Sequence, residues 1–410
     1  MNRASIIRSD DLRAENRYRI LRTLRREGPI SRAHVGKLTG LSQASLSNLM
    51  GLMTDQGILA SGGRQQKPVR RGRPQTALTL NHEIASAVTV ALSIDKLTVC
   101  VVDYAGETVL RHDHEPKTRS LGSEALSTLI VSAIQQAMTE VAVTNLQAIS
   151  FCFQGMTDSH SGELQWSPIL SMNRFPITQL LENTFSVPVS VNNDCAYIAQ
   201  ALSRLEPTKL GSSFAALSLS HGVGMGLYLS GKPVTGARSS AMEFGHIKFR
   251  DNGARCRCGK RGCIEAYTAD YAIVRAAMGL SQDEVQDELI TNSEMADCIE
   301  MARRNDKAAL QAFSSAGQAL GAGLAAVFTL LDPVPVALVG QISQAIDLYR
   351  DDIEKAVSSV GRTSVDYTHL IHCFDDDEML FHAGLVVEAT RILDRVCADK
   401  LTTSVEAEVN

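Results

Sequence analysis

Three of the nine cysteines of this chain fall within eight residues, in the stretch GHIKFRDNGARCRCGKRGCIEAY at positions 245–267. A histidine stands ten positions before the first of them, which gives the spacing H-x9-C-x-C-x4-C. Three thiolates and one imidazole complete the tetrahedral shell of a structural zinc ion and leave no open position. A redox pair or a chance cluster in a loop is the alternative. The predicted Zn²⁺ ligands are His246, Cys256, Cys258 and Cys263.

The other six cysteines are scattered singly among mostly apolar neighbours, a pattern that suits reduced, buried thiols better than disulfides. The N-terminus carries mixed charge without an apolar signal core, and no stretch approaches the roughly 20 uninterrupted apolar residues of a membrane span. We therefore expect a cytoplasmic protein without membrane insertion. A length of 410 residues predicts two or three domains, because one hydrophobic core rarely serves so long a chain.

Charge is divided unevenly along the chain. Residues 1–80 carry 15 Lys and Arg against 5 Asp and Glu, whereas the remainder carries 25 against 40. Solubility alone would not need this asymmetry. A basic head on an acidic body indicates that the head meets a polyanion.

The basic head has the helix pattern of a helix-turn-helix. Residues 11–27 place apolar side chains on one stripe, Ser31 can cap a short helix through Leu38, and Ser42 can cap a third helix, SQASLSNLMGLMTDQ. The last helix of such a motif enters the major groove by its N-terminal residues. The side chains expected to face inward on that helix are Leu46, Leu49, Met50 and Met53. Those expected to face DNA are Gln43, Ala44, Ser45, Ser47 and Asn48.

Two short β-like runs, 58–61 and 75–80, follow this helix and flank a basic loop, which predicts a wing. The loop segment RRGRP, at positions 70–74, is narrow and extended, and its arginines fit the negative potential of an A·T-rich minor groove. The third helix itself has no Arg or Lys. Attraction to the double-stranded DNA operator is therefore expected from Arg32, Lys37, Arg64, Lys67, Arg70, Arg71 and Arg73.

From residue 85 onward short β-branched runs alternate with helical stretches such as 123–141 and 306–331, which predicts an α/β body with mixed sheets. One turn between two strands, in SLSHGVGMGLYLSGKPVTGARS, carries closely spaced glycines at 222, 224 and 226. These glycines would let the backbone approach another group closely. A glycine-rich hairpin with no ligand would look similar.

The chain resembles full-length transcriptional repressors of the ROK family (repressors, open reading frames and sugar kinases), among them glucose-, N-acetylglucosamine- and xylose-responsive repressors. The resemblance runs from NRYRILRTLRREGPISRAHVGKLTGLSQASLSNLM to LGAGLAAVFTLLDPVPVALVG, and residues 245–265 match G-H-x-x-h-x-x-x-G-x-x-C-x-C-G-x-x-G-C-x-E throughout. It implies a winged helix-turn-helix followed by an actin-like, two-lobed sugar-kinase fold. The expected domains are 1–81 for DNA binding, 82–195 for the first lobe, completed by a helix near 380–400, and 196–380 for the second lobe with the zinc loop and the oligomerisation surface.

The family resemblance also implies a set of sugar ligands. The family motif E-x-G-H is EFGH here, the acidic residue closing the cysteine motif is retained, and the N-D pair lies in VNNDCAYIAQA. Clustered carboxylates and an amide can pair with several hydroxyls at once, and a zinc ion would fix the histidine ring. A solvated acidic rim is the alternative. The implied sugar-binding residues are Asn193, Asp194, Glu243, His246 and Glu265.

The nucleotide side departs from the family's kinases, in which Asp194 would be the catalytic base. The first phosphate loop, D-x-G-G-T, is replaced by ALSIDKLTVCVVD, and Ser220 and His221 stand in the second loop where kinases have Gly-Thr. The late G-G-G keeps Gly340 only. Backbone N–H groups cradle phosphate only where small residues allow a close approach. We therefore expect no enzyme activity and a vestigial base at Asp194, although residual sugar kinase activity stays open.

Together these features predict a sugar-responsive transcriptional regulator, most simply a repressor of carbohydrate uptake or catabolism genes. A homodimer or homotetramer would present paired heads to operator half-sites, and a monosaccharide or sugar phosphate in the cleft would change their spacing. One alternative is an active ATP-dependent sugar kinase with an appended head. Another is a repressor controlled by a transport phosphocarrier protein.

Overall fold

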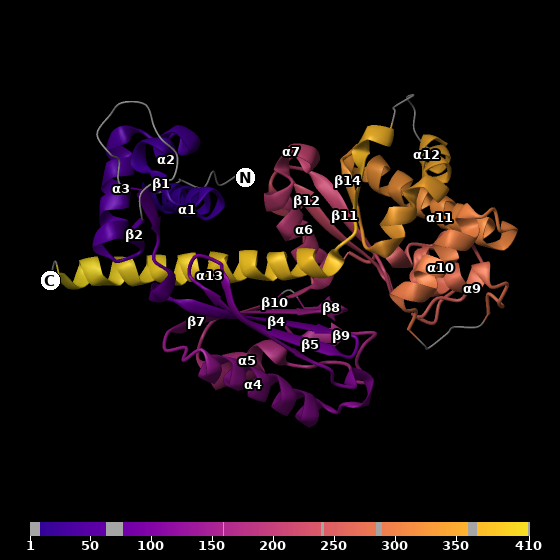
Figure 1. Cartoon of the computed structure of the whole chain (residues 1–410), viewed down its shortest axis with the longest axis horizontal. Helices are drawn as coiled ribbons and strands as arrows, with labels where there is room; N and C mark the ends of the chain where they lie inside the picture. Colours follow the sequence, from indigo (N-terminus) through magenta and orange to yellow (C-terminus); the bar gives the residue numbers. More distant parts are fainter. Residues whose placement is uncertain are drawn as a thin grey trace, which may run out of the picture. The chain divides into compact units, whose positions relative to one another are not determined.

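The structure is a computed structural model that describes residues 9–62, 77–158, 160–238, 242–283, 289–359 and 367–408 (Figure 1). The chain divides into two compact units of mixed α/β structure. The expected boundaries of the DNA-binding domain and of the two lobes stay predictions. The first unit comprises Met1–Phe151, Thr178–Ser190 and Val386–Asn410, and the second comprises Cys152–Ile177 and Val191–Leu385.

The N-terminal head is a winged helix-turn-helix, as predicted. The cap predictions are confirmed, since the Ser31 hydroxyl accepts from His34 N at 3.3 Å and the Ser42 hydroxyl accepts from Ser45 N at 3.2 Å. A two-residue strand before the second helix was not predicted. It pairs with the second wing strand, which gives an antiparallel sheet of order β1-β3-β2. The elements are α1 (Ser9–Glu27), β1 (Ile30–Ser31), α2 (Arg32–Thr39), α3 (Gln43–Asp55), β2 (Leu59–Gly62) and β3 (Ala77–Leu80).

Apolar side chains from all three helices form the core of the head. Gly40 ends α2 in the left-handed conformation, with φ of 68°, and its N–H donates to the carbonyl of Gly36 at 2.9 Å. A residue with a Cβ is strained at such a φ, so glycine sets the tight turn between α2 and α3. The buried side chains include the predicted stripes of α1 and α3, namely Ile20, Leu21, Leu24, Leu46, Leu49, Met50 and Met53.

The rest of the first unit is built on a five-stranded sheet of order β10-β7-β4-β5-β6. Helices α4 (Ser123–Glu140) and α5 (Ile177–Phe185) cover one face, and the part of α13 that begins at Val386 runs along the other face (Figure 1). The predicted helix 123–141 is confirmed as α4. The elements are β4 (Ser86–Ser93), β5 (Lys96–Asp103), β6 (Thr108–His114), α4 (Ser123–Glu140), β7 (Leu146–Phe153), α5 (Ile177–Phe185), β10 (Val189–Asn193) and α13 (Asp377–Glu408).

The second unit contains another five-stranded sheet, of order β13-β12-β11-β14-β15. Strands β11, β14 and β15 are parallel, and the hairpin β11–β12 is antiparallel. Helix α6 packs on β12, while α9 and α10 pack against the long helix α11. The elements are α6 (Asp194–Leu205), β11 (Phe214–Leu219), β12 (Val223–Leu229), β13 (Lys232–Pro233), α9 (Asp270–Ala277), α10 (Asn292–Arg303), α11 (Lys307–Leu331), β14 (Val336–Val339), α12 (Arg350–Ser358) and β15 (Ile371–Phe374).

Helix α11 confirms the helix predicted at 306–331. Among the described residues it is the one helix long and apolar enough to cross a membrane by length and composition alone. Within its most apolar window 56% is buried inside the protein, as in the core helix of a folded domain. Its apolar composition is explained by this packing.

Candidate metal centre and effector site

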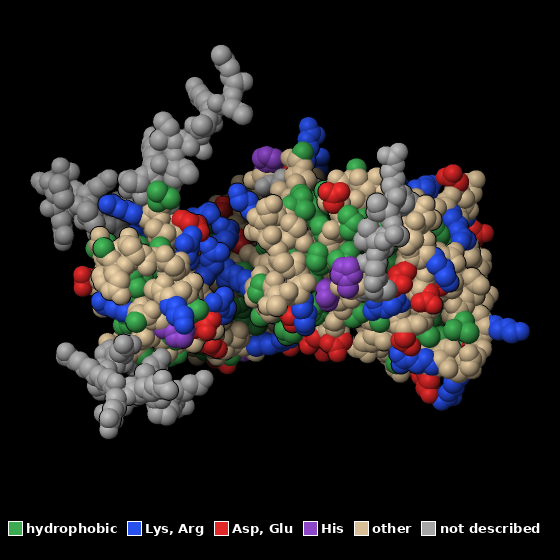
Figure 2. All heavy atoms as spheres, turned by 90° about the horizontal axis from the view of Figure 1, so that it is seen from above, with side chains coloured by type: hydrophobic (Ala, Val, Ile, Leu, Met, Phe, Trp, Pro, Cys, Tyr) green, Lys and Arg blue, Asp and Glu red, His purple; other side chains and the backbone are tan. Residues whose placement is uncertain are grey.

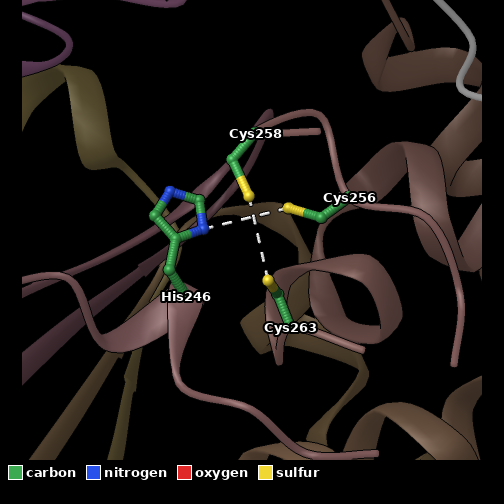
Figure 3. Close-up of side chains that lie close together, drawn as sticks. All are labelled: His246, Cys256, Cys258 and Cys263. Carbon is green, nitrogen blue, oxygen red and sulfur yellow. Dashed lines mark hydrogen bonds between the residues drawn. The ribbon is translucent and has the colours of Figure 1, made fainter. Parts of the chain in front are cut away.

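The four predicted zinc ligands lie together in the second unit and point toward one another (Figure 3). Their ligand atoms all lie within 4.8 Å of one another. The distance from Cys256 Sγ to His246 Nδ1 is 3.8 Å, as is the distance from Cys258 Sγ to Cys263 Sγ. A tetrahedron with metal–sulfur bonds of about 2.3 Å has edges of about 3.8 Å. The group could therefore hold a metal ion, and its size and donor chemistry fit Zn²⁺.

Glycines close the cysteine loop around this centre. Gly262 has φ of 76°, and a Cβ there would lie 1.6 Å from the carbonyl oxygen of Arg250. A Cβ on Gly253 would lie 2.2 Å from the hydroxyl of Tyr267. Because neither backbone carbonyl nor ring can move far in a packed loop, these positions exclude other residues. The loop is thus folded to bring the thiols together.

Glu265 connects the metal group to the turn between β11 and β12. It begins the short helix α8 (Glu265–Thr268) and is 7% exposed. Its Oε1 lies 3.3 Å from Cys256 Sγ, and its Oε2 accepts from the backbone N–H of Val223 at 3.3 Å. The hydroxyl of Tyr271 also donates to Oε1, at 3.4 Å. A buried carboxylate held on both sides in this way has a fixed orientation.

Glu243 and His246 lie at either end of the EFGH motif, around the short helix η3 (Phe244–His246). The Nδ1 atom of His246 faces the thiols, while its Nε2 lies 3.6 Å from Oε2 of Glu243. A carboxylate on the second ring nitrogen is the usual support of a metal-binding histidine. A Cβ on Gly245 would lie 2.3 Å from the carbonyl oxygen of Val223, so the glycine of the motif lets η3 pack on β12.

Asn193 and Asp194 lie at the start of α6. The side chain of Asn193 caps the helix by accepting from Ala196 N at 3.0 Å, and Asp194 Oδ1 accepts from Cys195 N at 2.9 Å. Burial raises the pKa of Asp194 to about 6, against the lowering effect of the Cys195 hydrogen bond. Asp194 nevertheless keeps part of its surface exposed. This carboxyl group therefore holds a proton far more readily than an ordinary aspartate.

The glycines predicted to approach another group closely do so, and the group is a helix. A Cβ on Gly224 would lie 2.4 Å from Cys195 Sγ, and a Cβ on Gly226 would lie 2.3 Å from the carbonyl oxygen of Cys195. The first turn of α6 thus packs directly on β12. Gly222 differs, because its Cβ would lie 3.3 Å from Oε2 of Glu265.

One pair near this site was not predicted. His221 Nδ1 lies 2.6 Å from Oδ2 of Asp270, a residue 49 positions away. In addition, Arg257 donates to the carbonyl oxygen of His221 at 3.0 Å, and its guanidinium lies 4.2 Å from the ring centre of Tyr271. The sequence analysis identified His221 only because it replaces a residue of the kinase phosphate loop. No local pattern indicated Asp270.

The side chains predicted to face DNA are exposed where the structure describes them. Arg32 lies at the start of α2, and the predicted positions on α3 all lie on its exposed side. Figure 2 shows Lys and Arg side chains gathered over the head, where α1 alone carries six arginines. The predicted wing-loop contacts Arg64, Lys67, Arg70, Arg71 and Arg73 lie outside the described residues. The exposed predicted residues are Arg32, Lys37, Gln43, Ala44, Ser45, Ser47 and Asn48.

Fold and site together define a class: an α/β protein with a winged helix-turn-helix head and a body that carries a His–Cys₃ group. The model of the ROK family matches residues 87–374, which is more than half of the chain. The chain belongs to the ROK family, and the predicted resemblance is confirmed.

Named relatives include both regulators and kinases. The chain is 22% identical over 346 residues to the xylose repressor of Bacillus spizizenii, covering 84% of this chain and 86% of the repressor. It is 23% identical over 360 residues to the DNA-binding transcriptional dual regulator NagC of Escherichia coli, covering 87% of each chain.

Two solved structures show the same fold. A ROK family transcriptional regulator, described as a homolog of the E. coli MLC protein, aligns with a TM-score of 0.74 at 22% identity, covering 95% of this chain and 99% of that one. A ROK family glucokinase from Streptomyces griseus aligns with a TM-score of 0.55 at 24% identity, covering 74% of this chain and 98% of the kinase. The predicted fold, a winged helix-turn-helix followed by the two-lobed ROK body, is confirmed.

Proposed function

We propose that this protein is a DNA-binding transcriptional regulator that responds to a sugar, most simply a repressor of genes for carbohydrate uptake or catabolism. One observation carries the proposal. The chain has two parts, a head with an exposed recognition helix and a ROK body. The body retains every residue type that binds sugar in the family. The relatives named xylose repressor and N-acetylglucosamine repressor support the same function. The operator would be double-stranded DNA.

The metal centre would have a structural role in this function. His246, Cys256, Cys258 and Cys263 would hold Zn²⁺, which has no open coordination position when four protein ligands surround it. A bound zinc ion would supply rigidity, by fixing the ring of His246. The same loop carries Glu265 at its end, so zinc would add to the hydrogen bonds from Val223 and Tyr271 that already orient this carboxylate.

The sugar would be bound by side chains that still have a donor or an acceptor available for a sugar hydroxyl. Glu265 already accepts from Val223 N and Tyr271, which leaves acceptor capacity for a ligand. Asn193 uses its carbonyl oxygen as the helix cap, so its amide N–H₂ remains to donate. Asp194, with its pKa raised to about 6, could accept or donate. The remaining proposed ligands are Glu243 and His246.

Two features support the absence of phosphate transfer. The register pairs Ser93 with Lys96, so β4 and β5 are joined by a two-residue turn where kinases of the family have a glycine-containing loop. Asp95 in that turn has φ of 49°, its N–H donates to Thr118 Oγ1 at 3.3 Å, and its carboxylate accepts from Thr118 N at 3.1 Å. A short turn without glycine, whose Asp95 N–H is already engaged and whose carboxylate is negative, is a poor cradle for phosphate. Asp194 would then contact the sugar and transfer no proton.

Regulation would act through the spacing of paired heads. A homodimer or homotetramer would place two recognition helices on half-sites separated by about 34 Å or multiples of it. A sugar changes DNA affinity only if it binds one arrangement of the protein more tightly than another. Repression relieved by sugar follows if the sugar-bound arrangement fits the operator less well.

The test has two arms. A duplex is first recovered by the protein from a random-sequence library, and its affinity is measured by fluorescence anisotropy with a panel of monosaccharides. We expect at least one sugar to change the affinity, and the Glu265→Gln variant to lose that response while binding DNA. A coupled ADP-release assay with the same sugars and ATP should show no turnover. Affinity that ignores every sugar, or turnover that Asp194→Asn abolishes, would contradict the proposal.

A further inference from the structure

The turn between β11 and β12 presents a histidine that the proposed sugar ligands do not include. His221 occupies the place of the phosphate-binding threonine of kinases, and its Nδ1 is held by Asp270 at 2.6 Å. The backbone strengthens this arrangement, because Asp270 N donates to the carbonyl oxygen of Ser220 at 3.0 Å. The carboxylate is 8% exposed and the imidazole is 34% exposed. Asp270 thus fixes the ring from the protein side.

The turn that carries this ring contacts one of the proposed sugar ligands, Glu265. The next residue, Gly222, is so close to Glu265 that a Cβ would lie 3.3 Å from its carboxylate oxygen. The residue after it, Val223, donates its N–H to the same oxygen at 3.3 Å. Among the residues that the structure describes, no side chain bonds to Nε2 of His221. A fixed imidazole, with no described side-chain partner at Nε2, therefore lies on the turn that also binds the Glu265 carboxylate.

The surroundings of this nitrogen are acidic. Asp377, at the start of α13, has a pKa that burial raises and that the nearby imidazole of His221 lowers. Asp377 in turn contributes to the raised pKa of Asp194. Helices α13 and α6 pack closely, since a Cβ on Gly384 of α13 would lie 2.0 Å from the carbonyl oxygen of Tyr197 in α6. The imidazole of His221 thus has Asp270 and Asp377 as neighbours, while Asp194 interacts with Asp377 and Glu265 binds the backbone of the same hairpin.

The guanidinium of Arg257, which contacts His221, is already engaged. Arg257 donates to the carbonyl oxygen of His221 and lies over the ring of Tyr271. A phosphate dianion placed here would face several carboxyl groups with little cationic compensation. A sugar hydroxyl both donates and accepts, so it matches Nε2 in either form of the ring.

We propose that His221 is a further effector-binding residue, that Asp270 positions it, and that the effector is an uncharged monosaccharide rather than a sugar phosphate. The inference rests on the proposed function. In this proposal, Nε2 of His221 binds a sugar hydroxyl at the position where kinases of the family have a phosphate-binding threonine.

The test uses the full-length protein and isothermal titration calorimetry. Glucose, N-acetylglucosamine and N-acetylmannosamine are each compared with their 6-phosphates. We expect a free sugar to bind, and its 6-phosphate to bind at least about tenfold more weakly. The variant His221→Asn keeps an amide near Asp270 but loses the position of Nε2, and should weaken sugar binding about tenfold, as for one lost hydrogen bond. His221→Gln restores a polar atom near that position and should recover part of the loss.

Asp270→Asn tests the positioning role. It should weaken sugar binding less than His221→Asn does, and the double variant should be no weaker than His221→Asn alone, because Asp270 acts through the imidazole. Zinc content, melting temperature and DNA affinity without sugar serve as controls and should match the wild type.

The outcomes separate the two levels of inference. If the wild type binds a sugar and His221→Asn binds it equally well, His221 is not a ligand, while the sugar-sensor function stands. If a 6-phosphate binds as tightly as its sugar, the assignment of an uncharged effector is overturned. If the wild type binds none of the six compounds, this inference is overturned, whereas the proposed function is judged separately by the DNA-affinity test with the full panel of monosaccharides.

Discussion

Arg25 provides a direct test of how the DNA-binding head is attached within the first unit. It lies in the last turn of α1, and its guanidinium forms a two-pronged ion pair with Asp394 of α13, at 2.6 and 2.7 Å. It also donates to the carbonyl oxygen of Tyr104 at 3.0 Å, and the Tyr104 hydroxyl donates to Asp394 at 3.0 Å. The side chains of the pair are 9% and 4% exposed. We predict that Arg25→Ala releases α1 from this site.

The magnitude follows from burial. Removing one partner of a buried ion pair leaves the other charge without compensation, which costs about 3–5 kcal/mol. Since about 1.4 kcal/mol corresponds to a factor of ten, the opening equilibrium of α1 should shift by roughly two to four orders of magnitude. Exposed pairs on the same helix offer a control. Arg22 with Glu15, at 52% and 55% exposure, should contribute about 0–1 kcal/mol.

Hydrogen exchange read by mass spectrometry measures this opening locally, so a global two-state transition is not required. Protection of α1 amides should fall in Arg25→Ala and remain nearly unchanged in Arg22→Ala. Replacing both partners with apolar residues, Arg25→Met with Asp394→Leu, should restore much of the protection, because no buried charge is left unpaired. Equal protection in the wild type and Arg25→Ala would refute the assignment of this pair as the attachment.

Three further predictions concern the zinc site, DNA binding and the carboxyl group of Asp194. Cys258→Ser should lose bound zinc, measured by elemental analysis, and lower the melting temperature, because metal binding stabilises the folded loop. Replacing Arg71 and Arg73 together with Ala should weaken DNA binding and reduce its salt dependence, whereas unchanged affinity and slope would exclude phosphate contacts. Asp194→Asn should stabilise the protein above pH 6, by up to about 3 kcal/mol. The raised pKa of Asp194 favours the protonated folded state, so the wild type loses stability as pH rises from about 4 to 6. A stability difference independent of pH would contradict that cause.

Local patterns predicted much of the head and of the metal centre. The N-caps Ser31 and Ser42 act on amides three residues away, and helix stripes repeat every turn, so both are visible in a short window of sequence. The zinc ligands fall within 18 positions of one another, so their spacing in the sequence was enough to predict the group. The exposed face of α3 followed from the same periodicity.

Contacts between distant segments could not be predicted in this way. Arg25 and Asp394 are separated by 369 positions, and His221 and Asp270 by 49. An arginine at a helix end and an aspartate in another helix are ordinary residues until the fold pairs them. The strand β1 was also missed, because two residues carry no periodicity and its formation depends on pairing with β3.

The glycine spacing of the β11–β12 hairpin has a consequence for reading genomes. Gly224 and Gly226 are needed because the first turn of α6 leaves no space for a Cβ. Selection for that contact would preserve the spacing in chains that never meet a nucleotide. The number of glycines in this hairpin would therefore not separate sensors from kinases. The length of the β4–β5 turn, which has two residues between Ser93 and Lys96 here, is the better criterion for classifying a sequence.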